Sequence, residues 1–355
     1  MGVFDEGCMG MFNAIIPDEL LHPTGAFKER LSQSSLYHAM TLVRDTEAKA
    51  VRTWLAKRGM TFRTGRNEAT QLTDRQIHEQ CRMYVAAARL AERHGCDAIG
   101  IQYQLGLTEL VAASDLAEGL LNCSDRPPVK AVEGPSKGRV IRDGLPITHF
   151  NEVDECAGLD GILTQRVCDA LGFEPDNTLH DLRWSDKDAS GTVEGDIWVL
   201  EISGAAPPSH FTGGYKGTTS ERQPPMYFRL GGGTVKGISR PGEVVWSRIY
   251  VDRDKKGAER LCMDLGRCRA VELPPAETQR RWNATTPQWP IMHAVTYGVT
   301  RDQMMARHKS NHIQVAYAAD ADAADAALLA KAALAERLGL RVSVCGTRKG
   351  GEEWR

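Results

Sequence analysis

The stretch DAIGIQYQ, residues 97–104, decides the class of fold that the sequence predicts. Its residues alternate as in a β-strand, and it ends in amides rather than in apolar side chains. A helix is predicted directly before it, because Thr73 and Gln76 form a capping box and Gly95 ends the helical pattern. In α/β sheets, polar groups at the carboxyl end of a parallel strand are where ligands bind. The stretch therefore indicates a parallel sheet with a ligand site at its edge.

The first 150 residues repeat this succession of short apolar runs and longer helical patterns. A strand is predicted at residues 2–4, and helices are predicted at 47–58 and 107–122. Such a succession is typical of a parallel sheet that is covered by helices. We therefore expect residues 1–175 to form a parallel-sheet, Rossmann-like α/β domain.

The composition changes after about residue 190. Short strand patterns, such as 196–204 and 244–252, now lie between glycine-rich and proline-rich turns. Near the carboxyl end, the spacing of Leu and Ala over residues 319–339 fits an amphipathic helix, and a final strand follows it. Period-two runs with such turns predict an antiparallel sandwich or barrel, so we expect residues 176–355 to form a β-rich, barrel-like domain.

The charge and cysteine content narrow the classes of partner and compartment. Charged residues make up 25% of the chain and the formal net charge is -2, so no excess of positive charge indicates a nucleic acid or a membrane surface as partner. The nine cysteines include no C-x-x-C pair, which argues for free thiols in a reducing cytosol. No apolar run is long enough to cross a membrane. We therefore expect a soluble cytoplasmic protein.

The stretch THFNEVDEC, residues 148–156, gathers Glu152, Asp154 and Glu155 within four positions. One interpretation is structural: Asn151 is the N-cap of a helix and Asp154 lies at its N3 position. Acids in a first turn favour the helix dipole by about 0.3–1 kcal/mol each. The other interpretation is that these acids contribute to a metal site. On this stretch alone, both interpretations stay open.

Two other stretches carry residue types that bind metal ions. TLHDLRWSD, residues 178–186, presents Asp181, and RHKSNHIQVAY, residues 307–317, presents His312 just before an apolar strand. Two carboxylates and one imidazole, with positions left for water and substrate, suit Mn²⁺, and Mg²⁺ or another divalent cation is the alternative. Each residue also has a structural explanation, because Asp181 can pair with Arg183 on the surface and backbone groups can satisfy the nitrogens of His312. Sequence spacing does not bring the three segments together.

Taken together, these stretches resemble segments of the L-fucose isomerase family, relatives of L-arabinose isomerase that convert aldoses to ketoses with a manganese ion. NEVDECAG resembles the family's E-x-D-x-x-x-G segment, HDLRW resembles its D-V-R segment, and SNHI resembles its A-N-H segment. The resemblance implies that Glu152, Asp181 and His312 are the ligands of a Mn²⁺ ion. It also implies that Glu152 and Asp181 are the catalytic acid and base.

Further segments resemble the family in the same order along the chain. GIQYQ is similar to the family's G-F-Q-G-Q, EISGA to its N-S-G, MYFRLGGG to its Y-F-R-G-G-G, and GCMGM to its S-M-G-I. The resemblance implies a set of sugar-binding side chains, which are Gln102, Ser203, Tyr227, Asn311 and Met9. It covers essentially the entire chain, with the first half similar to the family's second domain and the second half similar to its C-terminal domain.

The function that the resemblance implies is aldose–ketose isomerisation of a sugar such as L-fucose or D-arabinose through an enediolate. The family's habit implies a homo-oligomer, a trimer or a hexamer. Family members carry an additional N-terminal α/β domain, and the resemblance of this chain begins at the family's second domain. Two alternatives remain: a metal-dependent epimerase or aldolase that uses the same enediolate, and a non-catalytic, sugar-binding fragment that lacks the N-terminal domain.

Overall fold

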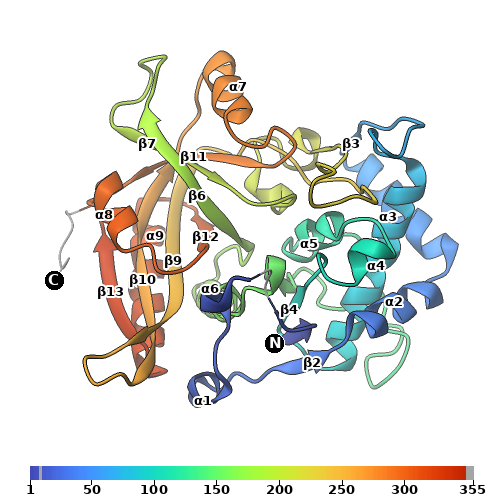
Figure 1. Cartoon of the computed structure of the whole chain (residues 1–355), viewed down its shortest axis with the longest axis horizontal. Helices are drawn as coiled ribbons and strands as arrows, with labels where there is room; N and C mark the ends of the chain where they lie inside the picture. Colours follow the sequence, from blue (N-terminus) through green and yellow to red (C-terminus); the bar gives the residue numbers. More distant parts are fainter. Residues whose placement is uncertain (8–9, 349–355) are drawn as a thin grey trace.

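The computed structural model describes residues 1–7 and 10–348. Its first half contains a sheet of four parallel strands, which lies near the middle of the molecule in Figure 1. The strands lie in the order β2 (Glu29–Leu31), β1 (Gly2–Phe4), β4 (Ala98–Ile101) and β5 (Thr148–His149). The strand order reverses between β1 and β4, which is the switch point where α/β sheets place ligands. The expected parallel sheet is confirmed.

Helices accompany this sheet in the first half. They are α1 (Asp18–Leu21), α2 (Gln33–Leu42), α3 (Asp45–Lys57), α4 (Asp74–Arg93) and α5 (Asp115–Leu121). The capping box that the sequence predicts before α4 is present, since Thr73 accepts from the Gln76 backbone and Gln76 reaches back to the Thr73 backbone. The buried residues in the first half of α4, such as Ile77 and Cys81, share one face, whereas residues 83–88 are all buried and the helix is enclosed there.

The second half is built around a closed barrel of six antiparallel strands. Its strands, in order around the barrel, are β11 (Ile291–Thr296), β7 (Asp196–Glu201), β6 (Asn177–Lys187), β12 (Ile313–Ala318), β9 (Gly242–Arg253) and β10 (Glu259–Ala270). Pairing of β10 with β11 closes the ring, and β13 (Arg341–Gly346) adds to β10 in parallel. The expected antiparallel barrel is confirmed.

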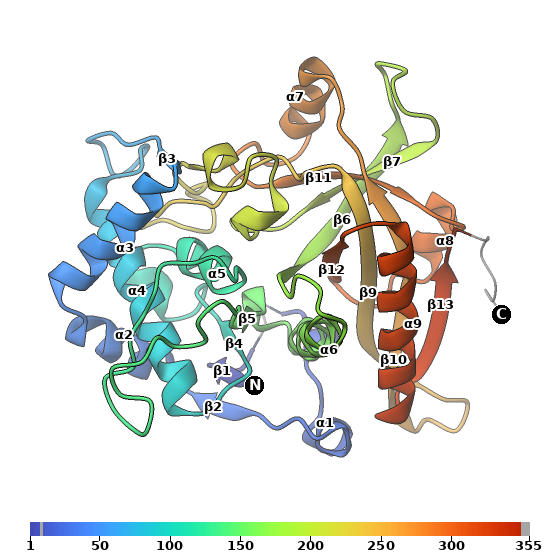
Figure 2. The same ribbon diagram turned by 180° about the vertical axis from the view of Figure 1, so that it is seen from behind.

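Two long helices connect and cover these parts. Figure 2 shows α6 (Glu155–Leu171) end-on between the parallel sheet and the barrel, and α9 (Ala321–Arg337) along the outer face of β9 and β10. One buried apolar cluster includes residues of β1 and β4 as well as residues of β9, β10 and α9. The core therefore runs without interruption from the parallel sheet through α6 to the barrel.

Shorter elements complete the fold. The helices α7 (Pro275–Asn283) and α8 (Arg301–Ala306) lie between barrel strands along the chain. The segment between β7 and β9 returns to the first half, where β8 (Thr219–Ser220) pairs with β3 (Thr61–Phe62). The pairing of β8 with β3 therefore joins the two halves by backbone hydrogen bonds as well as by side-chain packing.

The start of α6 differs from the expectation. Asp154, not Asn151, is the N-cap, and its side chain accepts a hydrogen bond from the Ala157 backbone amide at 2.8 Å. Asn151 instead lies one turn earlier, in the short 3-10 turn η4 (Asn151–Val153). The carboxyl end of the helix is as predicted, because Gly172 follows α6 in the left-handed conformation that favours glycine.

The described residues include eight of the nine cysteines, and all eight are buried. None of the helices in these residues is both long enough and apolar enough to span a bilayer.

The packing of the Phe150 ring determines the path of the chain that leads into α6. The ring lies between Gly100 of β4 and Gly158 of α6, where no side chain intervenes. A methyl group on Gly100 would overlap the ring, and one on Gly158 would lie 2.8 Å from it. The two glycines therefore permit the close packing of sheet, ring and helix that places residue Glu152.

Gly100→Ala is expected to lower the free energy of unfolding by about 1–3 kcal/mol, because the added methyl group overpacks the Phe150 ring. The measurement is urea unfolding monitored by circular dichroism. Phe150→Leu should also destabilise, but in that background the alanine should cost clearly less, because the ring that it strikes is gone. Additive effects of the two substitutions would contradict the contact as the cause.

Candidate metal centre

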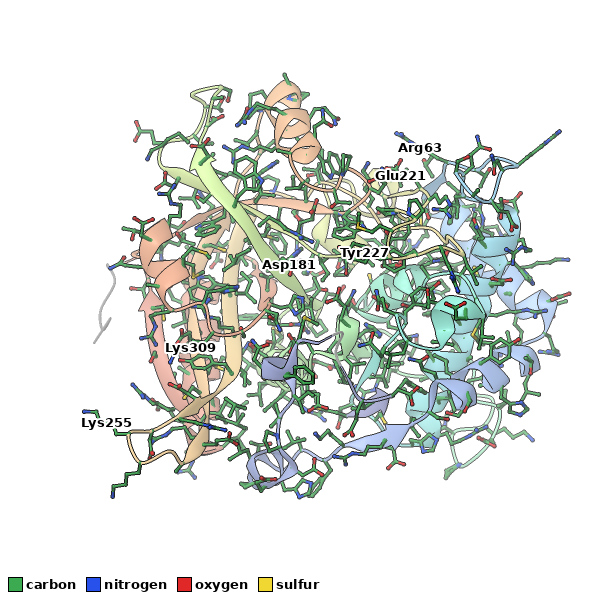
Figure 3. The ribbon with its side chains drawn as sticks, in the orientation of Figure 1. Arg63, Asp181, Glu221, Tyr227, Lys255 and Lys309 are labelled. Carbon is green, nitrogen blue, oxygen red and sulfur yellow. The ribbon has the colours of Figure 1, made fainter. Side chains whose placement is uncertain are left out.

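The three predicted metal ligands come from three separate elements that meet where the parallel sheet faces the barrel. Glu152 lies in η4, between β5 and α6, and Asp181 lies in β6. His312 directly precedes β12, which pairs with β6 in antiparallel orientation. Because Ile313 lies opposite His180, the same register places His312 beside Asp181. Figure 3 shows Asp181 in the middle of the molecule, between its two halves.

The two carboxylates approach the same ring nitrogen. His312 Nε2 lies 3.3 Å from Asp181 Oδ1 and 3.8 Å from Glu152 Oε2. The imidazole is buried, whereas the side chains of Glu152 and Asp181 keep 15% and 26% of their surface exposed. The structure thus brings the three side chains together at a place that solvent reaches.

The other nitrogen of His312 has a partner that fixes the ring. Nδ1 lies 2.6 Å from Asp154 Oδ2, and the second oxygen of Asp154 caps α6. Burial opposes a charge on the ring, but the hydrogen bond to Asp154 and the charges of Asp181, Asp154 and Glu152 raise the pKa of His312 to about 9. A carboxylate on the far nitrogen orients many metal-binding histidines in this way.

In the part of the chain that the structure describes, no three or more His, Cys, Asp or Glu side chains already surround one position for a metal ion.

The donor set nevertheless fits a hard divalent cation. Oxygen and nitrogen ligands bind such ions at about 2.0–2.2 Å, so two donors of one ion lie no more than about 4.4 Å apart. The separations of 3.3 and 3.8 Å from His312 Nε2 meet this condition. Two carboxylates with one imidazole suit Mn²⁺ or another divalent cation, and they differ from a structural zinc site, which would use thiolates.

Glu152 is held in an uncommon backbone conformation. Its φ is 58° and that of Val153 is 53°, so two successive residues that carry side chains adopt the left-handed region. Each such residue costs about 1–3 kcal/mol and persists only where surrounding contacts impose it. Burial raises the pKa of the Glu152 carboxyl, and the nearby charge of His312 opposes that shift. Ser203 Oγ donates to Glu152 Oε1 at 2.9 Å and fixes the other end of the side chain.

Asp181 is held through its second oxygen. Arg183 Nη2 lies 2.8 Å from Asp181 Oδ2, and Arg183 Nε lies 3.4 Å from the buried Glu201 Oε2. Arg183 also stacks over the indole of Trp289, at 5.1 Å from the ring centre. The pairing of Asp181 with Arg183 that the sequence suggested is therefore present, and it leaves Oδ1 of Asp181 facing His312.

Two of the predicted sugar-binding side chains lie directly at this centre. Ser203 contacts Glu152, and Gln102 follows the carboxyl end of β4. Gln102 Nε2 donates to the backbone carbonyl of Glu152 at 3.3 Å, while its Oε1 is buried and has no hydrogen-bond partner among the described residues. An unpaired buried amide oxygen costs free energy, so it is a position where a bound hydroxyl group would restore a lost hydrogen bond.

The other predicted sugar-binding side chains are less directly placed. Tyr227 is 49% exposed and its ring packs edge-on against Phe228. Asn311 donates to the side chain of Asn13 at 3.1 Å. Among the described hydrogen bonds, none joins Tyr227 or Asn311 to the three candidate ligands. Met9 lies outside the described residues.

Sequence reasoning missed two buried acids of α5, Asp115 and Glu118. Burial raises the pKa of Asp115 to about 7 and that of Glu118 well above its ordinary value, and the charge of Glu152 adds to both shifts. Glu118 accepts a hydrogen bond from the Asn151 side chain. This bond explains why Asn151 does not cap α6. No signal in the sequence marks these acids, since a helix period gives no sign of which polar residues face inward.

Comparisons with known proteins do not identify the chain. No family model matches it, and no curated protein matches it in sequence.

Asp154→Asn is expected to lower the pKa of His312 below about 9 in metal-free protein, because it removes one negative charge from Nδ1. Asparagine is also a good N-cap, so α6 should remain intact. The measurement is an NMR titration of the imidazole signals, in which His312→Gln identifies the signal of His312.

Asp320→Asn is the matched control, since Asp320 caps α9 through the backbone amides of Asp322 and Ala323. It should leave the titration of His312 unchanged. An equal pKa of His312 in the wild-type protein and in Asp154→Asn would exclude Asp154 as the group that holds the ring charge.

Proposed function

We propose that this protein is a divalent-metal-dependent aldose–ketose isomerase that uses Glu152, Asp181 and His312 as the ligands of Mn²⁺. The observation that carries the proposal is the approach of both carboxylates to His312 Nε2, at 3.3 and 3.8 Å, with Asp154 on Nδ1. The resemblance to the L-fucose isomerase family supplies the reaction class. A Rossmann-like first domain and a substrate such as L-fucose or D-arabinose are parts of the same proposal.

Isomerisation moves one proton from C2 to C1 of the sugar and one proton from O2 to O1. A divalent cation held by Glu152, Asp181 and His312 would stabilise the negative charge that develops on the sugar oxygens. Glu152 and Asp181 would act as the acid and base that remove and return the carbon-bound proton. His312 would act only as a ligand through Nε2, with its ring oriented by the contact of Nδ1 with Asp154.

Two carboxylates next to a cation are weakened as bases, because the positive charge stabilises their ionised forms. The surroundings of Glu152 work against this effect, since burial raises the pKa of its carboxyl. The strained backbone at Glu152 and Val153 supports the same role, because strain of this kind concentrates at active sites.

Polar groups around the centre suit the hydroxyl groups of a sugar. Gln102 Oε1 is available as an acceptor, and the Ser203 hydroxyl lies next to Glu152. Tyr227 and Asn311 belong to the binding set through the resemblance. The half-exposed ring of Tyr227 is accessible to a substrate that enters from solvent.

Glu152→Gln is expected to abolish turnover and to weaken Mn²⁺ binding by at least about 10–100-fold. Loss of a residue that only hydrogen-bonds to a metal ligand already weakens metal binding by this factor, and Glu152 is proposed as a ligand itself. Calorimetric titration of metal-free protein with Mn²⁺ measures the affinity, and circular dichroism confirms that the fold is retained. Asp302→Asn, at a side chain that is 85% exposed on α8, is the control and should bind as the wild type does. Equal affinity of Glu152→Gln and wild type would remove Glu152 from the ligand set.

The reaction class is tested by proton NMR of pentoses and deoxyhexoses incubated with the Mn²⁺-loaded protein. Isomerisation in deuterium oxide should yield the ketose and, in the aldose re-formed from it, deuterium at C2. An epimer without ketose, or a cleaved carbon chain, would identify an epimerase or an aldolase instead. Binding of the sugars without any product would favour a non-catalytic sugar-binding protein.

A further inference from the structure

A groove unrelated to the candidate metal centre lies in the first half of the molecule. It runs between the helices α3 and α4 and the chain segment 127–138, and its volume is about 530 Å³. This volume lies within the range of about 300–1,000 Å³ that small-molecule sites occupy. None of its lining residues belongs to the candidate metal centre.

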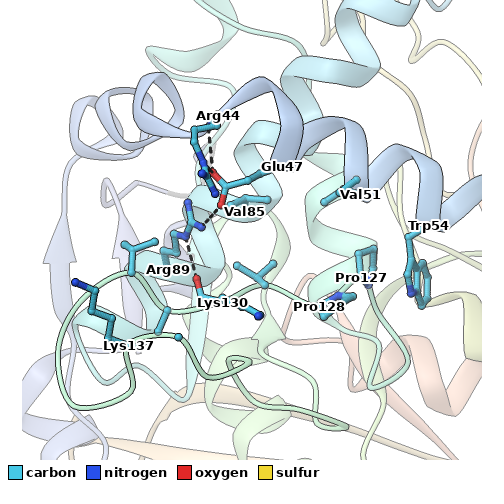
Figure 4. Close-up of a pocket in the computed structure, with 15 residues that line it drawn as sticks. Arg44, Glu47, Val51, Trp54, Val85, Arg89, Pro127, Pro128, Lys130 and Lys137 are labelled. Atoms are coloured by element: carbon cyan, nitrogen blue, oxygen red, sulfur yellow. Dashed lines mark hydrogen bonds and ion pairs between the residues drawn. The ribbon is translucent and has the colours of Figure 1, made fainter.

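The groove has an apolar floor. Val51 of α3, Val85 of α4 and Val129 of the covering segment are buried beneath it. Trp54 and the consecutive Pro127 and Pro128 line one end, as Figure 4 shows. An aromatic or aliphatic group of a ligand would lose its contact with water at this end.

Cationic side chains gather toward the other end of the groove. Figure 4 shows Arg44, Arg89, Lys130 and Lys137 there, and Glu47 is the single carboxylate of the lining. The groove therefore combines an apolar region with an excess of positive charge. Such a combination selects for a ligand that is both apolar and anionic.

The single carboxylate offsets only one of the four positive charges, and both of its oxygens are engaged by arginines of the groove. Glu47 accepts from Arg44 Nε at 3.2 Å and from Arg89 Nη2 at 2.5 Å. Burial opposes its ionisation, but the hydrogen bonds from Arg89 and Arg44 lower the pKa of Glu47 to about 2. Among the described residues, Lys130 and Lys137 have no anionic partner.

Arg89 also ties the two walls of the groove together. Its Nε donates to the backbone carbonyl of Lys130 at 3.2 Å, so the covering segment is fixed to α4. The side chain of Arg89 is 15% exposed and is therefore held in place rather than extended into solvent. A fixed guanidinium beside the two exposed ammonium groups of Lys130 and Lys137 provides one anchored donor and two solvent-facing donors for an anion.

We propose that this groove binds a small organic carboxylate with an apolar or aromatic body. The body lies against Trp54 and the valine floor, and the carboxylate lies among Arg89, Lys130 and Lys137. A neutral or cationic molecule of the same shape cannot form the ion pairs with Arg89, Lys130 and Lys137, and it therefore binds more weakly. The proposal is independent of the metal centre and of the proposed isomerase activity.

The test uses phenylbutyrate as the probe and phenylbutylamine as its cationic match, with calorimetric titration of the full-length protein. Phenylbutyrate is expected to bind with a Kd of about 1 mM or tighter, an affinity that a ligand with so few atoms can reach. The amine is expected to bind at least about tenfold more weakly. The double variant K130E/K137E should weaken phenylbutyrate binding at least about tenfold. Ala50→Trp, at an exposed position of α3 in the lining, should block the groove and abolish it.

The matched control is K255E/K256E, which makes the same charge change in the turn between β9 and β10. Figure 3 shows Lys255 on the opposite side of the molecule from α3 and α4, which Figure 1 labels in the same orientation. The control variant should bind phenylbutyrate as the wild type does. Equal binding of the acid and the amine, or full binding by Ala50→Trp, would overturn the proposal. So would a self-association that K130E/K137E abolishes without any phenylbutyrate binding, because the groove would then hold a second copy of the chain.

Discussion

The imidazole of His312 is held from both sides by carboxylates, and the arrangement of the centre depends on this constraint. Asp154 fixes Nδ1 at 2.6 Å, so Nε2 has only one direction in which to point. Asp181 and Glu152 meet that nitrogen from two different elements, β6 and the turn before α6. Three negative charges around one buried ring are tolerated only when a cation is present among them, whether a proton on the ring or a divalent ion.

The fold places these groups through packing that lies away from them. The ring of Phe150, pressed between Gly100 and Gly158, sets the path of the chain into η4, where Glu152 and Val153 adopt strained conformations. Asp154 serves both as the cap of α6 and as the partner of His312, so the position of the helix and that of the ring are coupled. Because α6 also packs on both the parallel sheet and the barrel, the centre forms only when the two halves are together.

Local signals in the sequence predicted much of the fold. The capping box at Thr73, the strand after it and the helix of residues 319–339 each follow from a period or a cap that the neighbouring residues impose. The residues of the centre were found through a resemblance, because spacing along the chain contains no information on which distant segments meet. The cap of α6 was assigned wrongly, since Asn151 and Asp154 are both good caps, and only the tertiary bonds of Asn151 to Glu118 and of Asp154 to His312 decide between them.

The shared position of three donor atoms is tested most directly by the anomalous X-ray scattering of a crystal soaked in Mn²⁺. The account predicts one strong peak within about 2.0–2.3 Å of a Glu152 oxygen, an Asp181 oxygen and His312 Nε2, with Asp154 still bound to Nδ1. A peak that lacks any of these three ligands, or no peak at the ring of His312, would contradict it.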